Sequence, residues 1–319
     1  MSNEKSETIY VTPSLHWSLV GGFSTQRESL IIEEPLVVEI SFDRHGHKIQ
    51  RVVGVTMRTP GNDEELVLGL LYAEGIIQSI TDVRSSAAAE REEKSEEVTI
   101  WKVELARAPD ADLERRKRGF TASSACGLCG RVSLKGLPLR PAPGRPDDKR
   151  LLASLIAVLP EKLRRRQSSF FLTGGCHGAA ICDSDGRVVV VVVVVVVRED
   201  VGRHNAVDKA IGAALLQGVR LGKQILVLSG RVSFELVQKA SMAQIGTIVA
   251  VGAPSSYAVT LAHTVGITVI GFARDGRFNV YSHLGRVDFR LDRHDNSSEA
   301  RDNNSDDQAS IRSIEGAVP

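Results

Sequence analysis

Cysteines, aromatic residues and an excess of charge of either sign are all scarce in this chain. Four cysteines in 319 residues are too few for a secreted domain stapled by disulfides. Aromatic residues make up 5% and form no stacking series among basic residues, which disfavours binding of single-stranded nucleic acid. With 40 Lys and Arg against 39 Asp and Glu, the net charge of +1 gives no general attraction to nucleic acid or anionic membranes.

Long apolar segments and several well-known motifs are also missing. The longest apolar run, Val188–Val197, is about half as long as a bilayer-spanning helix. Residues 1–12 lack the apolar core of a secretory signal, so we expect a cytoplasmic protein. The chain has neither a G-x-x-x-x-G-K-[ST] sequence nor an H-x-E with a P-C-x-x-C. These absences exclude a P-loop NTPase and disfavour a zinc-dependent deaminase.

The composition that remains is typical of a soluble globular protein, with 42% hydrophobic and 25% charged residues. At about 150 residues per domain, this length allows one or two domains. The last segment is rich in Asn, Ser and Asp and cannot offset its ordering entropy. We expect a polar tail at 1–28, a β-rich domain at 29–105, a mobile linking loop at 106–147, an α/β domain at 148–290 and a disordered tail at 291–319.

The spacing of apolar residues predicts a change of fold class along the chain. The first part reads as strands with one helix, which begins at a capping box of Asn62 and Glu65. The second part alternates strands with helices and predicts a mostly parallel sheet with helices on both faces. Its predicted helices are 148–159, which stops at Pro160, 204–217, 233–245 and 255–265. Its predicted strands are 169–173, 224–228, 247–251, 267–272 and 278–281, with a hairpin formed by 179–182 and the valine run.

The strongest local motif is S-S-A-C-G-L-C-G, which contains Cys126 and Cys129. Its glycines let a partner approach the backbone closely. The basic run at 114–118 can lower a thiol pKa and so produce a better nucleophile at neutral pH. A persulfide carrier needs an exposed nucleophilic cysteine with a neighbour that assists it, and this pattern fits that need best.

Three other interpretations of the C-x-x-C stay open. A structural zinc site needs four ligands, and the remaining candidates do not form a second C-x-x-C. A thioredoxin-like exchanger would carry the motif between a strand and a helix, whereas this one follows a basic loop. Two purely structural cysteines are the third interpretation. We expect no zinc, and the candidate ligands weighed for it are Cys176, His177 and Cys182.

Four further motifs combine glycine with charge where predicted strands end. The Gly-Gly turn of G-G-C-H-G-A-A can offer free backbone N–H groups to an anion. R-E-D-V-G-R-H-N and L-S-G-R-V-S-F-E each lead from a strand into a helix. The alternative for the first is a solvated charged face, and the alternative for the second is an ordinary turn. In G-F-A-R-D-G-R-F, Arg274 and Arg277 flank a tight turn and can hold phosphate or a guanine edge. Since ligands bind at the carboxyl edge of such sheets, we expect one polar, phosphate-tolerant pocket. Its further candidate residues are His177, Asp200, Arg203, His204 and Asn205.

Together with R-T-P-G-N-D-E-E-L-V-L-G-L-L-Y-A-E-G-I-I, these motifs resemble, in order over residues 30–285, the formate dehydrogenase accessory sulfurtransferase family, FdhD. The resemblance implies a sulfurtransferase that takes persulfide sulfur from a cysteine desulfurase. It passes this sulfur to the bis(molybdopterin guanine dinucleotide) molybdenum cofactor before the cofactor enters formate dehydrogenase. Cys126 would carry the persulfide and Cys129 would assist. The alternative is a chaperone that binds the cofactor without sulfur transfer.

The same resemblance implies a C-terminal fold similar to cytidine deaminase without its zinc, and a homodimer. It also implies that the cofactor is bound by Phe272, Ala273, Arg274, Asp275, Gly276 and Arg277. Three features depart from the family pattern: the valine run, the polar tails and Cys176. The valine run puts the register of its hairpin in doubt, and Cys176 beside the Gly-Gly turn suggests a third thiol near the cofactor.

Overall fold

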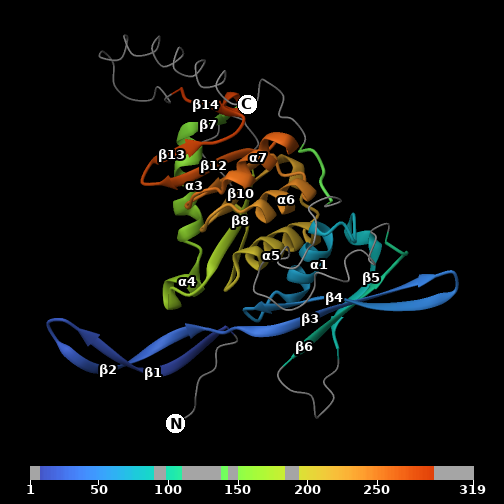
Figure 1. Ribbon diagram of the computed structural model, residues 1–319, viewed down its shortest axis with the longest axis horizontal. Helices are drawn as coiled ribbons and strands as arrows, with labels where there is room; N and C mark the ends of the chain where they lie inside the picture. The colour runs from blue at the N-terminus through green and yellow to red at the C-terminus, as the bar shows by residue number, and fades with distance from the viewer. Residues whose placement is uncertain (1–7, 90–97, 110–137, 143–149, 184–193, 291–319) are drawn as a thin grey trace.

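The computed structural model describes residues 8–89, 98–109, 138–142, 150–183 and 194–290. They form a β-rich N-terminal part with one helix, followed by a mixed six-stranded sheet with helices (Figure 1). Among these residues, no helix combines the length and apolar character that a membrane span requires. Cys126, Cys129, most of the valine run and the predicted C-terminal tail lie outside the described residues.

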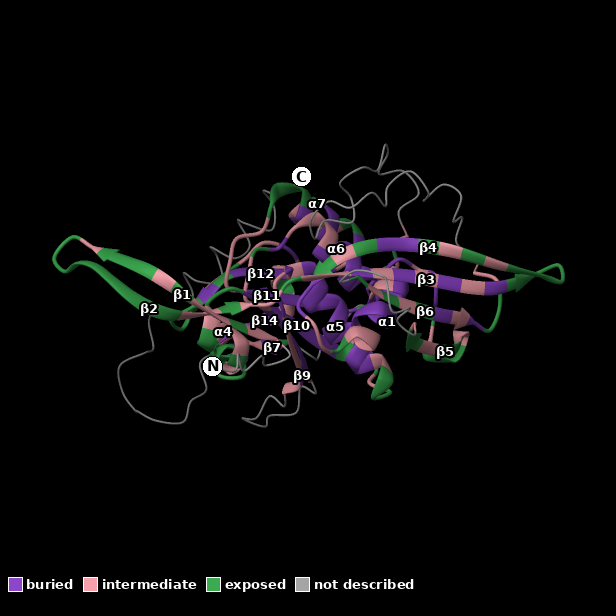
Figure 2. Ribbon diagram, turned by 90° about the horizontal axis from the view of Figure 1, so that it is seen from below, coloured by how far each residue is buried: buried purple, intermediate pink, exposed green. Residues whose placement is uncertain are grey.

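The first described element is a β-hairpin, where the sequence predicts only a polar tail. Strand β1 (Ile9–Ser18) pairs antiparallel with β2 (Gly22–Ile31), so the prediction for residues 1–28 was wrong from Ile9 onward. The hairpin projects from the molecule and is largely exposed (Figure 2). Because neither face is fully buried, its strands lack the regular apolar alternation that identifies a strand in a sequence.

A four-stranded sheet of order β4-β3-β6-β5 follows, with α1 on its buried face. The strands β3 and β4 form the predicted hairpin, with a bulge between Val38 and Glu39. β5 was not predicted because its sequence, V-R-S-S-A-A, has little apolar content. The elements are β3 (Glu34–Arg44), β4 (His47–Arg58), α1 (Asp63–Ala73), β5 (Val83–Ala88) and β6 (Thr99–Leu105).

Helix α1 begins without the predicted capping box. Asn62 adopts a left-handed conformation with φ 58° and its side chain makes no capping hydrogen bond. Acidic residues fill the first turn and stabilise the positive end of the helix dipole. Two of these carboxylates also form ion pairs with arginines. Asp63 pairs with the buried Arg58, and Glu65 pairs with Arg198 of the C-terminal part.

The C-terminal sheet has the order β13-β12-β11-β10-β8-β9. Only the β10–β11 and β11–β12 pairings are parallel, whereas β10–β8, β8–β9 and β12–β13 are antiparallel. The sheet is therefore mixed, not mostly parallel as predicted, because hairpins extend the parallel centre on both sides. The strands are β8 (His177–Asp183), β9 (Val194–Asp200), β10 (Gln224–Leu228), β11 (Thr247–Ala250), β12 (Thr268–Arg274) and β13 (Arg277–Val280).

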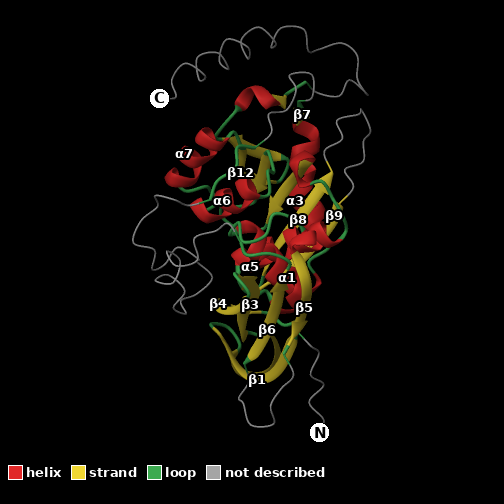
Figure 3. Ribbon diagram, turned by 90° about the vertical axis from the view of Figure 1, so that its right-hand side faces the viewer, coloured by secondary structure: helices red, strands yellow, loops and turns green. Residues whose placement is uncertain are grey.

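Helices cover both faces of this sheet, as predicted (Figure 3). Alternate residues of β8 show the two faces: Ala180 and Cys182 pack toward α3, whereas Ala179 and Ile181 pack toward α5. The helices are α3 (Ala153–Arg164) on one face, with α5 (Arg203–Leu216), α6 (Phe234–Met242) and α7 (Ser256–Val265) on the other.

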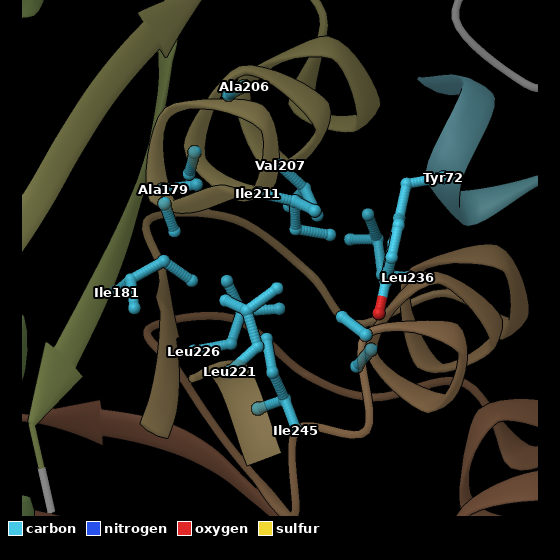
Figure 4. Close-up of a cluster of buried hydrophobic side chains, with 14 of the residues drawn as sticks. Tyr72, Ala179, Ile181, Ala206, Val207, Ile211, Leu221, Leu226, Leu236 and Ile245 are labelled. Carbon is cyan, nitrogen blue, oxygen red and sulfur yellow. The ribbon is translucent and has the colours of Figure 1, made fainter. Parts of the chain in front are cut away.

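The N- and C-terminal parts share one hydrophobic core. Tyr72 of α1 lies in the same cluster as Ile211 of α5, Leu236 of α6 and Ile181 of β8 (Figure 4). Helices α1 and α5 cross where a glycine of each helix lies against the backbone of the other helix. A methyl group on Gly69 would lie 1.9 Å from the carbonyl oxygen of Asp208. The N-terminal part is thereby held against the helix that begins at the predicted pocket.

Two predicted elements of the C-terminal part were wrong. Residues predicted as a strand form α4 (Ser168–Thr173), because Glu199 accepts hydrogen bonds from the N–H groups of Ser169 and Phe170 and fixes the first turn. The helix predicted to end at Pro160 instead runs through it to Arg164. Burial of Leu159 and Leu163 against the sheet outweighs the hydrogen bond that proline cannot donate.

The end of the predicted mobile loop is fixed in place. The N–H and C=O of Arg140 both bond to the Ser241 hydroxyl of α6, at 3.1 and 2.6 Å. Ala142 donates to the carbonyl of Val265 at the end of α7. Residues 138–142 therefore belong to the packed body, contrary to the prediction. A short parallel pair, β7 (Leu151–Leu152) and β14 (Val287–Asp288), completes the described strands.

Candidate functional site

The predicted pocket motifs do meet at one edge of the C-terminal sheet. β10, β11 and β12 are parallel, so the loops that follow them lie together. β8 is antiparallel to β10 and therefore begins at this edge with His177. β9 is antiparallel to β8 and ends there at Asp200, directly before α5. This placement follows the rule that open α/β sheets bind ligands where strands end.

Backbone hydrogen bonds join the three loops at this edge. The N–H of Gly252 donates to the carbonyl of Gly230 at 3.1 Å, and the N–H of Phe272 donates to the carbonyl of Gly252 at 3.2 Å. A methyl group on Gly252 would lie 2.9 Å from the backbone of Gly230 and of Arg231. Only glycine therefore allows the loops after β10 and β11 to approach this closely.

Asp200 connects this edge to the N-terminal part. It is fully buried and pairs with the ammonium group of Lys209 at 2.8 Å. It also accepts hydrogen bonds from the N–H groups of Thr59 and Gly202, at 3.1 and 2.8 Å. Lys209 in turn donates to the Thr59 carbonyl at 2.7 Å. The network fixes the start of α5 relative to β4.

Asn205 belongs to the same network. Its amide nitrogen donates to the Met57 carbonyl at 2.7 Å and to Asp200 at 3.1 Å, and its oxygen accepts from the Thr56 hydroxyl at 3.0 Å. The side chain is 4% exposed. The structure therefore gives Asn205 a positioning role rather than a free polar group for a ligand.

His204 lies buried between α5 and α6. Its Nε2 is 2.8 Å from Glu235 and 3.1 Å from the Ser233 hydroxyl. Burial lowers the pKa of His204 despite the neighbouring carboxylate, and the charges of Lys239 and Arg203 lower it further. The imidazole is therefore held neutral. Its Nδ1 has no hydrogen-bond partner within the described part of the chain.

His177 faces the loop that follows β10. A methyl group on Gly230 would lie 3.3 Å from His177 Nδ1, so the backbone at Gly230 packs closely against this imidazole. Burial lowers the pKa of His177, and the charges of Arg203 and Arg231 lower it further. Three basic side chains, those of His177, Arg203 and Arg231, therefore lie close together here. The sequence analysis named His177 and Arg203 as candidate pocket residues but did not name Arg231.

The predicted cofactor segment, Phe272 to Arg277, forms the end of β12 and its turn into β13. Phe272 has φ 52° and is 40% exposed, at a register shift of the strand pair. Asp275 and Gly276 form a turn with positive φ, and the exposed Arg274 and Arg277 pair across it. Ala273 is fully buried against α3, so it can reach a ligand only through its backbone.

The two cysteines within the described residues are poor nucleophiles. Cys176 is 5% exposed, and its thiol donates to Glu199 at 3.3 Å. Burial and the negative charge of Glu199 raise its pKa. Cys182 is 1% exposed on the α3 face, where burial raises its pKa to about 12. Cys176 therefore does not fit the role of a reactive third thiol.

In the described ranges, no group of three or more His, Cys, Asp or Glu side chains is arranged to hold a metal ion. The ligands weighed for zinc include Cys176, which is bonded to Glu199, and Cys182, which lies in the core.

Comparison with known proteins identifies the family. Residues 31–288 match the sequence model of the FdhD/NarQ family. The chain belongs to this family. Relatives named sulfur carrier protein FdhD occur in Mycobacterium tuberculosis, with 41% identity over 274 residues, and in Streptomyces coelicolor, with 40% over 282. These alignments cover 82% and 85% of this chain, and 93% of each relative. A relative of the same name in Thermoplasma acidophilum is 38% identical, covering 83% of this chain and 89% of its own.

A solved structure supports the fold of this FdhD/NarQ family chain. A crystal structure described as a candidate formate dehydrogenase accessory protein, from Desulfotalea psychrophila, superposes with a TM-score of 0.62 at 24% identity. The match covers 88% of this chain and 99% of that one. At this identity, the likeness supports the fold alone.

Two features of this sheet edge were missed by the sequence analysis. Arg231 lies within the motif L-S-G-R-V-S-F-E. Its proximity to His177 depends on how β8 pairs with β10, which the sequence does not show. The contacts of Asp200 with Thr59 join residues 141 positions apart, which no local pattern reveals. A glycine-flanked arginine directly after a buried strand was the one available signal for Arg231.

Proposed function

We propose that this chain is a sulfurtransferase that carries persulfide sulfur on Cys126. The chain has four cysteines, and the two that are described are buried, with pKa values raised by burial. A sulfur carrier needs a thiolate that partners can reach, so this observation leaves the C-x-x-C to supply it. The relatives named sulfur carrier protein FdhD support the same activity.

The proposed chemistry is two successive transfers. The Cys126 thiolate attacks the outer sulfur of a cysteine desulfurase persulfide, and the desulfurase thiolate leaves. Cys129 then attacks the inner sulfur of the Cys126 persulfide. A Cys126–Cys129 disulfide forms and the outer sulfur leaves as hydrosulfide with the electron pair. Hydrosulfide and a proton replace an oxo ligand of molybdenum as sulfide and release water. A cellular thiol reductant then restores the two thiols.

The proposed cargo is the bis(molybdopterin guanine dinucleotide) molybdenum cofactor, bound at the carboxyl edge of the C-terminal sheet. The exposed Arg274 and Arg277 suit a guanine nucleotide, since guanidinium groups bind phosphate and guanine edges through paired hydrogen bonds. Formate dehydrogenase is the proposed recipient. The resemblance also supports a homodimer, a cytoplasmic location and a cytidine deaminase-like C-terminal domain.

Formate dehydrogenase activation tests the sulfur transfer. In cells whose own copy of this gene is deleted, Cys126→Ala is expected to abolish formate dehydrogenase activity. Cys182→Ala, in the core far from the edge, is the matched control and should retain it. Full activity with Cys126→Ala would contradict the proposal.

A cofactor chaperone without sulfur transfer is the second candidate. It is supported by the polar edge of the sheet, which needs no cysteine. Under this alternative, Cys126→Ala activates formate dehydrogenase normally, whereas Arg274→Ala/Arg277→Ala abolishes GDP binding and activation together. Under the sulfur-carrier proposal, the double arginine variant loses GDP affinity but still accepts sulfur on Cys126.

A further inference from the structure

We infer that His177, Arg203 and Arg231 form a cradle for the diphosphate group of the proposed cargo. This inference rests on the proposed function and deepens it. The three side chains come from three elements: the start of β8, the start of α5 and the loop after β10. The predicted nucleotide segment, by contrast, lies at the end of β12.

Backbone contacts bring these elements together. The N–H of Gly178 donates to the Ser229 hydroxyl at 2.9 Å, which holds the loop after β10 against the start of β8. Gly230 is so close to His177 that an added methyl group would lie 3.3 Å from the imidazole. His177 also pairs with Asp200 across the strands, three residues before Arg203. Arg203 and Arg231 are close enough that their charges lower the pKa of His177.

The two arginines lack the partners that other arginines of this chain have. Arg58 pairs with Asp63 and Glu34, and Arg198 pairs with Glu65. Within the described residues, neither Arg203 nor Arg231 makes an ion pair or a side-chain hydrogen bond. The Nε of Arg203 is buried without a hydrogen-bond partner. A buried guanidinium N–H without a partner is costly, so an anion that accepts its hydrogen bond would stabilise it.

The nearby carboxylates are already used. Asp200 is fully buried and pairs with Lys209 while it accepts hydrogen bonds from the backbone. Glu235 contacts His204 at 2.8 Å. Two uncompensated guanidinium groups therefore remain beside His177. This combination suits an oxyanion with two negative charges, because guanidinium groups bind phosphate oxygens in a paired geometry.

The position fits a nucleoside diphosphate whose base lies at the end of β12. β10 and β12 are separated by β11, so their ends lie about 10 Å apart at about 4.8 Å per strand. A base near Arg274 and a diphosphate near Arg231 would then follow the same edge. The glycines at 230 and 252 keep the backbone between them free of side chains.

Nucleotide titration of single variants tests the cradle. Arg231→Gln and Arg203→Gln are each expected to weaken GDP binding roughly tenfold or more, because charge-assisted hydrogen bonds to phosphate are lost. Affinity for guanosine should stay unchanged, and the preference of the wild-type protein for GDP over GMP should shrink. Inorganic pyrophosphate should compete with GDP in the wild type. Arg220→Gln, which removes the same charge at the exposed loop after α5, should leave GDP affinity unchanged.

Sulfur loading of Cys126, measured on the same preparations, separates this inference from the proposed function. If Cys126 loads but GDP affinity is unchanged in both variants, the cradle is wrong and the sulfur-carrier proposal stands. If Cys126 does not load, that proposal fails whatever the GDP result. An equal loss of GDP and guanosine affinity overturns the cradle. The cradle is also overturned if the wild-type protein binds neither GDP nor pyrophosphate. Arg231 is exposed, so its variant decides the question even if Arg203→Gln unfolds.

Discussion

Adding one methyl group at the crossing of α1 and α5 is expected to destabilise the protein and disturb its site. A Cβ on Gly69 would lie 1.9 Å from the Asp208 carbonyl oxygen, and one on Gly212 would lie 1.8 Å from the Glu65 carbonyl oxygen. Ordinary contact begins at 3.4 Å, so the helices would have to separate by about 1.5 Å. In both cases the added methyl group would meet backbone atoms of the opposite helix, so no flexible side chain can move aside.

The expected change in the free energy of unfolding has the opposite sign to that of an ordinary Gly→Ala substitution in a helix. In a helix with free space, Gly→Ala stabilises by about 0.5–1 kcal/mol. Overpacking a closed contact costs about 1–3 kcal/mol or more. We therefore expect Gly69→Ala and Gly212→Ala each to lower the free energy of unfolding by about 1–3 kcal/mol. The double variant should cost less than the sum, since one displacement relieves both contacts.

Urea denaturation followed by circular dichroism measures these free energies. Leu216→Ala, at the exposed end of α5, is the control and should change stability by at most about 0.5 kcal/mol. GDP affinity should fall with Gly212→Ala, because α5 carries Arg203 at its start. A Gly69→Ala protein as stable as the wild type, or more stable, would refute the close crossing.

Two further predictions concern the buried polar groups beside the site. Asp200→Ala should cost about 3–5 kcal/mol, because it leaves Lys209 buried without its partner, and Asp200→Ala/Lys209→Met should recover part of this loss in urea denaturation. A single variant that costs under about 1 kcal/mol would contradict the network. Burial lowers the pKa of His204 below its usual 6.5, so its contribution to stability is full above that pH and is lost as the pH falls. His204→Gln should therefore cost more at about pH 7.5 than at about pH 5.5, and an equal cost at both would rule out a neutral buried His204.

The centre of the fold was predictable because its sequence pattern and its packing agree. The strands β10 and β11 are short runs of β-branched and aliphatic residues, and both are fully buried. The elements that failed depend on distant contacts. The residues of α4 have strand-like composition, yet Glu199, about 30 positions away, fixes them as a helix. β1 and β2 bury too little of either face to show a strand pattern.

The meeting of the predicted motifs at one sheet edge was predictable, whereas the surroundings of each side chain were not. Glycine and charge at strand ends indicated the edge, because topology alone brings such ends together. Which side chains are free could not be inferred. Asn205 was predicted to line the pocket, yet its side-chain amide is hydrogen-bonded to the Thr56 hydroxyl and the Met57 carbonyl. Arg231, in contrast, has no partner among the described residues, and only the pairing of β8 with β10 brings it to His177. The C-x-x-C remains a sequence prediction, since both cysteines lie outside the described residues.

The most direct test of the account is the mass of each cysteine after sulfur loading. The purified protein would be incubated with a cysteine desulfurase and free cysteine, alkylated, digested and measured by mass spectrometry. The account predicts an added sulfur atom on Cys126 and none on the buried Cys176 and Cys182. Cys126→Ala should abolish the added sulfur, while Cys182→Ala should leave it unchanged. Sulfur on Cys176 in the wild-type protein, or undiminished loading of Cys126→Ala, would contradict the central claim.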